Sequence, residues 1–227
     1  MLEHNNPNIT EYHEYQKPLE MPEHLAFKPL TKATNQVTVR ISGRHIHLCP
    51  ADLYALFGPG YTLHKYKDLN QPGQFAAKET LTVVGPKGVI EGVRVLGPLR
   101  DKTQVEISGT DGYHLGVDPP VRDSGDLEGT PGIVLVGPKG AVNLKEGLIL
   151  AATHIHMHTS DAERLNLRNG DRVQVLIDGE RDLIFTKVLV RVSDKFNTEM
   201  HIDTDEANAA VIEDGDIVEI IGKFAPM

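Results

Sequence analysis

Residues 44–48 read RHIHL, and residues 153–157 read THIHM. A histidine–isoleucine–histidine triplet therefore occurs twice in the chain. Each copy is followed by a stretch with the pattern of a short helix, ADLYALFG at 51–58 and DAERLNLRNGD at 161–171. A triplet that returns with the same kind of neighbour predicts an internal duplication, in which two related units make up the fold.

A second pair of strings extends this repeat. TQVEI at 103–107 resembles TEMHI at 198–202, and their alignment places Glu106 opposite His201. The spacing from triplet to string differs between the two halves, so the loops differ in length. The string VGPKG also occurs twice, at 84–88 and at 136–140. It predicts a hairpin turn at both places, because Gly and Pro favour tight turns.

The segments around these strings have the period of short strands. Val37, Val39 and Ile41 alternate with polar residues, which is the strand period of two. Similar short apolar runs follow as far as residue 221, separated by glycine-rich turns, and this pattern is typical of closed or sandwiched antiparallel sheets. In PADLYALFG, Pro50 suits the first turn of a helix and Gly58 its end.

The histidine triplets suggest metal chemistry. On a strand, residues i and i+2 point to the same face, so His45 and His47 present two imidazoles together. His154 and His156 do the same, and Glu106 or His201 could supply a third ligand to either pair. Three protein ligands leave one position open, which is the pattern of a catalytic zinc. The duplication sets these six residues apart from His64, His114 and His158, which we expect at the surface.

Two further residues have chemistry that the pattern leaves open. Cys49, the single cysteine, lies two residues after His47 and directly before Pro50. This place favours the N-cap of the helix, with a covalent acyl intermediate as the alternative. Arg100 could bind an oxyanion through its guanidinium, or it could be a solvated loop arginine. The loop Arg122–Gly132, RDSGDLEGTPG, is either an ordered turn or a loop that lines a ligand site.

Composition excludes some classes of protein. The formal charge of −9 argues against a general binder of nucleic acid or of anionic membranes, and an anionic substrate would need a local cation. One cysteine allows no intrachain disulfide, which fits a reducing compartment. We find neither a run of about 20 apolar residues that would span a membrane nor a secretory signal. Residues 1–36 contain four prolines and few apolar residues, and we interpret them as an extended or partly ordered tail.

Several strings together resemble the phosphate propanoyltransferase family of propanediol degradation, whose members are phosphotransacylases associated with bacterial microcompartments. The resemblance covers about residues 37–221, and these strings carry it: SGRHIHL, LFGPGY, QPGQFAAKET, VVGPKG, VRVLGP, KTQVEIS, PVRDSGDLEGTPG, HIHM and MHIDTDEANAA. It implies a reversible reaction in which acyl-CoA (propanoyl-CoA or acetyl-CoA) and phosphate give acyl phosphate and coenzyme A.

The resemblance also implies a structure. We expect a mainly β fold of two small β-barrels related by internal duplication and capped by short α-helices. The expected units are a tail (1–36), a first barrel (37–46 and 153–223) and a second barrel (47–152). Between them we expect two Zn²⁺ ions per chain, with Arg100 as the catalytic residue. His45 and His47 would lie near His201, and His154 and His156 near Glu106.

The chain departs from the family pattern at three places. Cys49 stands where serine is usual, Thr153 where arginine commonly precedes the triplet, and HTSDA at 158–162 replaces the usual TPEDA. None of these is a proposed ligand. The cysteine in place of serine favours the capping role.

Two other functions fit the same residues. A zinc-dependent hydrolase would use the ligands to activate water, and a non-enzymatic barrel would hold structural zinc. We expect a cytoplasmic protein that acts on small molecules, with the microcompartment lumen as the alternative location. Assembly into a homo-oligomer or association with a microcompartment is left open.

Overall fold

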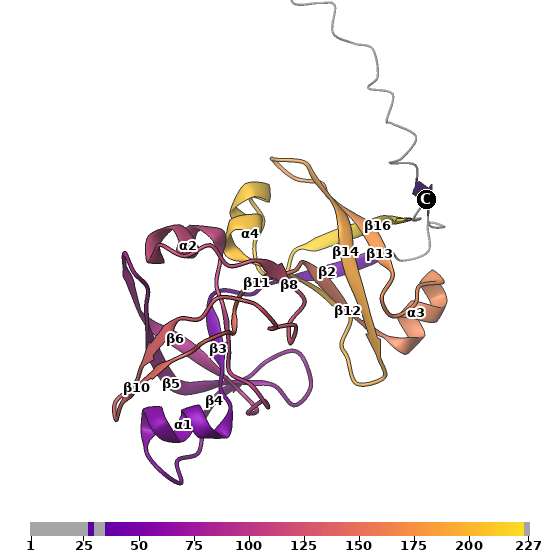
Figure 1. Cartoon of the computed structure of the whole chain (residues 1–227). Helices are drawn as coiled ribbons and strands as arrows, with labels where there is room; N and C mark the ends of the chain where they lie inside the picture. Colours follow the sequence, from indigo (N-terminus) through magenta and orange to yellow (C-terminus); the bar gives the residue numbers. More distant parts are fainter. Residues whose placement is uncertain (1–26, 30–34, 225–227) are drawn as a thin grey trace, which may run out of the picture.

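The computed structural model describes residues 27–29 and 35–224 (Figure 1). The chain forms two β units that lie beside each other, with short helices at their ends. The expected tail lies almost wholly outside the described residues.

The first unit is a closed six-stranded barrel, because β2 pairs with β15 on one side and with β16 on the other. A short strand, β1 (Phe27–Pro29), extends its edge by pairing with β16. The strands follow one another around the barrel in the order β16 (Ile217–Phe224), β13 (Arg172–Ile177), β14 (Leu183–Ser193), β12 (His154–His158), β15 (Glu199–Ile202) and β2 (Gln36–Ile41).

The second unit is a curled sheet that forms a half-barrel without closing. A further strand, β4 (Lys65–Asp68), pairs with β5 outside the main path. The main path runs β10 (Ala141–Asn143), β9 (Val134–Val136), β5 (Phe75–Val84), β6 (Val89–Gly97), β3 (His45–His47), β7 (Gln104–Glu106), β11 (Leu148–Ala151) and β8 (Val121–Arg122). The prediction of a mainly β chain of two barrel-like units with short helices is confirmed, with one unit closed and the other open.

The middle residue of each triplet anchors its strand in a core. Ile46 and Ile155 have no exposed surface, and each belongs to the apolar cluster of its own unit. Burying such a side chain contributes about 1.5–3 kcal/mol. Because neighbouring residues on a strand point to opposite faces, this burial turns the flanking histidines away from the core, toward the space between the units.

Four short helices cap the units: α1 (Pro50–Phe57), α2 (Gly109–Leu115), α3 (Thr159–Leu165) and α4 (Thr204–Ala210). The prediction for α1 is confirmed, since Pro50 occupies its first turn and Gly58, with φ of 106°, ends it. The N-terminal ends of α2 and α4 are capping boxes built on Ser108 and Asp203, which accept hydrogen bonds from the backbone of the first turn.

The two units repeat the same local arrangement. In the half-barrel, β3 pairs in parallel with β6 and antiparallel with β7. In the barrel, β12 pairs in parallel with β14 and antiparallel with β15. A helix follows the first strand of each set (α1 or α3), and another follows the third (α2 or α4). The GPKG hairpins also form, since they join β5 to β6 and β9 to β10.

The chain passes from one sheet to the other at two described places. Residues 42–44 lead from β2 in the barrel to β3 in the half-barrel, and residues 152–153 lead back from β11 to β12. All three residues of the first triplet therefore belong to the half-barrel sheet. We accordingly propose that the first change of unit lies at 42–44 rather than after Ile46.

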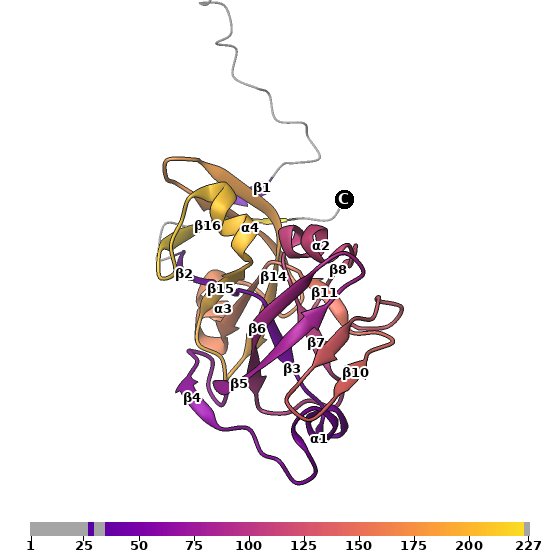
Figure 2. The ribbon, with the colours of Figure 1, turned by 90° about the vertical axis from the view of Figure 1, so that its left-hand side faces the viewer.

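Direct contacts join the two units. Helices α2 and α4 lie side by side (Figure 2), and Thr110 N donates to Asp205 Oδ2 at 2.7 Å. In a second contact, Gln71 Nε2 of the half-barrel unit donates to Glu199 Oε1 on β15 at 2.6 Å, and both residues are buried. None of the described helices is long and apolar enough to cross a bilayer.

Candidate functional site

The first histidine pair meets a carboxylate across the sheet. In the antiparallel pairing of β3 with β7, His45 is the direct partner of Glu106. The Nε2 atom of His45 lies 3.4 Å from Glu106 Oε2, and that of His47 lies 4.0 Å from Glu106 Oε1. All three residues are buried, and one ligand atom from each lies within 4.8 Å of the other two.

The second pair meets a histidine at the equivalent place. His154 is the direct partner of His201 in the pairing of β12 with β15. The two rings stack with centroids 5.1 Å apart, and the Nε2 atoms of His154 and His156 are 3.1 Å apart. The alignment of Glu106 with His201 in sequence therefore corresponds to equivalent positions in the two sheets.

This grouping differs from the one that the resemblance implied. His45 and His47 lie beside Glu106, and His154 and His156 lie beside His201. The reason is the early change of sheet at residues 42–44, which places the first triplet beside β7 instead of β15.

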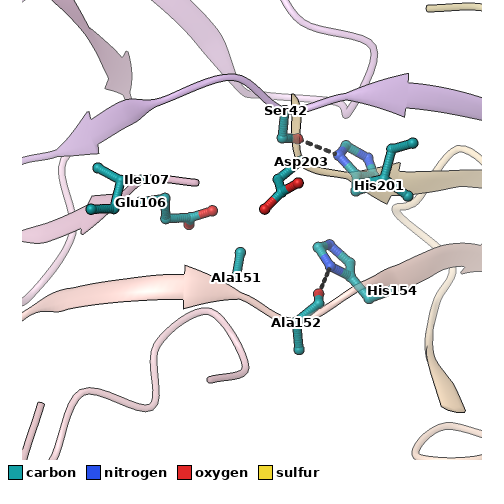
Figure 3. Close-up of a pocket in the computed structure, with 9 residues that line it drawn as sticks. Ser42, Glu106, Ile107, Ala151, Ala152, His154, His201 and Asp203 are labelled. Atoms are coloured by element: carbon teal, nitrogen blue, oxygen red, sulfur yellow. Dashed lines mark hydrogen bonds between the residues drawn. The ribbon is translucent and has the colours of Figure 1, made fainter. Parts of the chain in front are cut away.

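All six side chains nevertheless share one cleft between the units. A cavity of about 450 Å³ is lined by both histidine pairs, Glu106, His201 and Arg100. Glu106 also faces the second set, because a smaller cavity of about 20 Å³ is lined by Glu106, His154 and His201. Figure 3 shows the Glu106 carboxylate pointing into the space that the rings of His154 and His201 border.

Backbone carbonyls set the orientation of one imidazole in each pair. His45 Nδ1 lies 2.9 Å from the carbonyl oxygen of Gly43, and His154 Nδ1 lies 2.8 Å from that of Ala152. A carbonyl only accepts, so Nδ1 carries the proton in both rings. Each Nε2 is then free to offer its lone pair toward the cleft, which is the usual arrangement of a metal-binding histidine.

Burial keeps most of these imidazoles neutral. Burial, followed by the neighbouring histidines, lowers the pKa of His154 to about 4 and that of His156 to about 3. Burial, followed by the charge of His45, lowers the pKa of His47 to about 2. Neutral imidazole is the form that binds metals, so at neutral pH these three side chains are ready as ligands.

His45 and Glu106 behave as a coupled pair. Burial opposes the charge of His45, but the charge of Glu106 and a hydrogen bond to it raise the pKa of His45. Burial would likewise raise the pKa of Glu106, but His45 outweighs it and the pKa is lowered. A positive charge between the two atoms is therefore favourable.

The donor set fits a metal ion. Two imidazoles and one carboxylate are ligand types that zinc prefers, and three protein ligands leave a position open. The buried Nδ1 atoms of His47 and His156 have no hydrogen-bond partner among the described residues, and the His156 ring is held by stacking on Phe196. The cluster of His45, His47 and Glu106 could hold a metal ion.

Arg100 lies at the wall of the same cleft, beside the first set. Its Nη1 donates to Ser124 Oγ at 3.0 Å, and Ser124 Oγ donates to Glu106 Oε1 at 3.2 Å. The side-chain amide of Gln104 also donates to Glu106 Oε1, and the Oε1 atom of the same amide accepts from Gly125 N at 2.8 Å. Ser124 belongs to the loop 122–132, so part of that loop lines the cleft.

Cys49 occupies the N-cap of α1, but its side chain makes no capping hydrogen bond. Its backbone N–H is held instead by Thr103 Oγ1 at 3.0 Å. Cys49 is absent from the lining of the cleft.

The three histidines that we expected at the surface lie outside the cleft lining. His64 and His114 are exposed on the half-barrel, and His158 is the N-cap of α3, where its side chain accepts a hydrogen bond.

Comparison with known proteins identifies the family. The family model described as phosphate propanoyltransferase matches residues 38–213. A phosphate propanoyltransferase of Thermotoga maritima is 58% identical over 186 residues, which cover 82% of this chain and 89% of that protein. Those of Rhodopseudomonas palustris and Listeria monocytogenes are 53% and 54% identical, and the matches cover 83% and 82% of this chain and 83% and 88% of the relatives.

The chain belongs to the phosphate propanoyltransferase family. As a member it is an enzyme of the phosphate acyltransferase class. The residues that carried the resemblance, including both triplets, lie within the matched region, and the first 37 residues precede it.

Sequence reasoning missed part of the cleft. Arg191 on β14, Ser42 after β2 and Gln104 on β7 all lie near the six candidate ligands. Arg191 comes there because β14 runs parallel to β12 and pairs Arg191 with His156. No local pattern indicates that pairing. Gln104 could have been found, since it lies two residues before Glu106 and so on the same face of its strand.

Proposed function

We propose that this enzyme transfers an acyl group reversibly between coenzyme A and inorganic phosphate, with acetyl-CoA or propanoyl-CoA as donor. The observation that carries the proposal is the cleft, in which a metal-type ligand cluster and Arg100 border the same cavity of about 450 Å³. The names of the relatives support propanoyl transfer to phosphate in particular.

We propose two zinc ions per chain. His45, His47 and Glu106 would hold one, and His154, His156 and His201 the other, with Glu106 facing both sets. When bound, zinc supplies a Lewis acid that polarises a carbonyl or phosphate oxygen. The carboxylate is fixed for this purpose by its hydrogen bonds from Ser124 and Gln104.

A groove that adjoins the cleft suits coenzyme A. Its volume is about 550 Å³, and it shares Ser42, His45 and His201 with the site. Its lining also includes Tyr66, three carboxylates (Asp68, Glu199 and Asp214) and four basic side chains, which are Arg40, Arg44, Lys67 and Arg94. Basic side chains bind phosphate groups, and an aromatic side chain can stack on an adenine ring. Arg40 and Arg44 already form salt bridges with carboxylates. Lys67 and Arg94 are therefore the groove's cations through which a chain of net charge −9 would bind an anionic substrate.

The protein's own groups act by positioning and by charge. Arg100 would hold phosphate with one oxygen facing the thioester carbonyl, and such positioning can lower a barrier by about 7–11 kcal/mol. A phosphate oxygen attacks the carbonyl carbon, and Arg100 offsets the negative charge that develops on the carbonyl oxygen. The carbon–sulfur bond then breaks, coenzyme A leaves as the thiolate with the electron pair, and acyl phosphate remains.

The test is release of free thiol from acetyl-CoA and propanoyl-CoA, with and without phosphate. We expect release only with phosphate, together with formation of acyl phosphate. Release of thiol at the same rate without phosphate would indicate the hydrolase and contradict the proposal. Absence of release under both conditions, with folded metal-loaded protein, would favour a structural role for the metal.

Location and assembly are proposals that rest on the family alone. We propose the cytoplasm as the site of action, with the lumen of a microcompartment as the alternative, and small molecules as the main partners. Fractionation of cells that express the tagged full chain, followed by detection in purified microcompartments, separates the two locations.

A further inference from the structure

A second guanidinium faces the cleft from the opposite unit. Arg191 lies on β14 of the barrel, whereas Arg100 follows β6 of the half-barrel, and both line the cavity of about 450 Å³. The register of β12 and β14 places Arg191 directly beside His156. Paired residues on adjacent strands present their side chains to the same face, so Arg191 points where the second histidine set points.

Ser124 holds both arginines. Its side-chain oxygen accepts from Arg100 Nη1 at 3.0 Å, and its backbone oxygen accepts from Arg191 Nη2 at 3.1 Å. One residue of the loop 122–132 therefore ties a guanidinium from each unit to the same point. Two like charges are brought together in this way, although each repels the other.

Neither arginine has an acidic partner that would offset this repulsion fully. Within residues 27–29 and 35–224, no carboxylate forms a salt bridge with Arg100 or Arg191. Burial lowers the pKa of Arg100, Glu106 partly opposes that effect, and the charge of Arg191 lowers it again. Both cations are half-buried, so their charges are only partly solvated.

We propose that Arg191 is a second phosphate-binding residue and that inorganic phosphate is held between Arg100 and Arg191. A planar guanidinium donates two parallel hydrogen bonds to a phosphate, so two of them can satisfy a dianion from both sides. The bound phosphate also bridges the half-barrel and the barrel. This inference deepens the proposed function and rests on it, since phosphate is the acyl acceptor there.

The kinetic test varies phosphate against fixed acyl-CoA in the full-length, metal-loaded enzyme. We expect Arg191→Gln to raise the KM for phosphate by about 10–100-fold, because one charge-assisted contact is lost. The KM for acyl-CoA should change far less, and Arg191→Lys should recover part of the effect. Arg172→Gln is the matched control, because Arg172 lies on neighbouring β13 and lines a different cavity.

A direct binding measurement separates this inference from the proposed function. Inorganic phosphate is titrated calorimetrically into wild type, Arg191→Gln and Arg172→Gln, and metal content is measured in each. We expect at least about tenfold weaker binding in Arg191→Gln alone, with unchanged metal content.

Wild-type affinity for phosphate in a folded Arg191→Gln protein would overturn the inference, even if thiol release depends on phosphate. If wild type binds phosphate without releasing thiol, the proposed function fails, and the titration still decides the role of Arg191. Should the glutamine variant not fold by circular dichroism, Arg191→Lys decides, since an unchanged KM and an unchanged affinity for phosphate would then contradict the inference.

Discussion

His45 on β3 and Glu106 on β7 stand directly opposite each other, with Nε2 and Oε2 3.4 Å apart at the wall of the cleft. The equivalent pair in the other unit is His154 and His201. The duplicated sheets therefore bring two sets of potential ligands to one place from opposite sides. The account predicts that metal binding, substrate binding and the contact between units depend on one another there.

Removing a ligand should weaken metal binding directly. We expect Glu106→Gln to lower zinc affinity by more than the about 10–100-fold that loss of an outer partner costs, because a charged ligand is lost. Competition with a chromophoric chelator measures the affinity. His114→Ala is the control, since this exposed histidine lies on α2 outside the cleft. Equal zinc affinity in Glu106→Gln and wild type would remove Glu106 from the metal site.

Arg100 should matter for turnover and not for metal content. We expect Arg100→Ala to lower kcat/KM by about 10²–10³-fold, the typical loss for one donor to a developing oxyanion. Metal analysis should give the same content as wild type. Lys102→Ala serves as the control, because this exposed lysine lies two residues away and pairs with Glu146. Normal turnover in Arg100→Ala would contradict the assignment.

The contact between Gln71 and Glu199 should stabilise the junction of the two units. Gln71 Nε2 donates to Glu199 Oε1 at 2.6 Å and to the carbonyl oxygen of Asn197 at 2.9 Å. We expect Gln71→Ala to lower the free energy of unfolding by about 1–3 kcal/mol, because a buried carboxylate loses a donor. Urea titration measures the change, with exposed Gln36→Ala as the control. Equal losses in the two variants would show that the contact adds nothing specific.

Glu79 on β5 should make stability depend on pH. Its buried carboxylate accepts hydrogen bonds from Tyr61 Oη at 2.9 Å and from the backbone N–H of His64 at 3.1 Å. Burial alone would raise the pKa of Glu79, but hydrogen bonds, with that of the His64 side chain the strongest, hold it below its usual value. A lowered folded pKa stabilises the protein above the ordinary glutamate pKa of about 4.3, and this contribution is lost as pH falls through the folded value.

The variant Glu79→Gln isolates that effect. At pH 7 we expect it to be less stable than wild type by about 1 kcal/mol, and the difference should shrink between about pH 5 and pH 3. Urea unfolding at a series of pH values measures the difference. Asp68→Asn is the control, since Asp68 is an exposed carboxylate whose salt bridge, among the described residues, is with Lys65 at the surface. A difference that stays constant with pH would show that the charge of Glu79 is not its source.

Local sequence patterns were sufficient to predict the strands that carry the histidine triplets and the internal duplication. The alternation around Ile46 and Ile155 predicts which residues face the core, and the flanking histidines follow from the strand period. The resemblance to the family singled out Arg100 as the candidate catalytic residue. It implied that the first triplet lies near His201, whereas the structure places His45 and His47 beside Glu106. The sheet to which β3 belongs is decided by a three-residue link, 42–44, that has no periodicity.

Local sequence patterns did not predict the contacts between residues on distant strands. Arg191 reaches the cleft through a parallel pairing, and Gln71 reaches Glu199 across the junction of the units. Both are non-local consequences of how the sheets close. Gln71 begins the string QPGQFAAKET, but that string does not indicate its contact with Glu199. The buried polar residues at such a junction are recognised only when their partners are known.

The most direct test of the central claim is an anomalous difference map at the zinc edge, from crystals of the full chain loaded with zinc and soaked in phosphate. The account predicts zinc peaks at His45, His47 and Glu106 and at His154, His156 and His201, with phosphate density beside Arg100. A map with no zinc peak at these side chains, in protein that still releases thiol in the presence of phosphate, would contradict it.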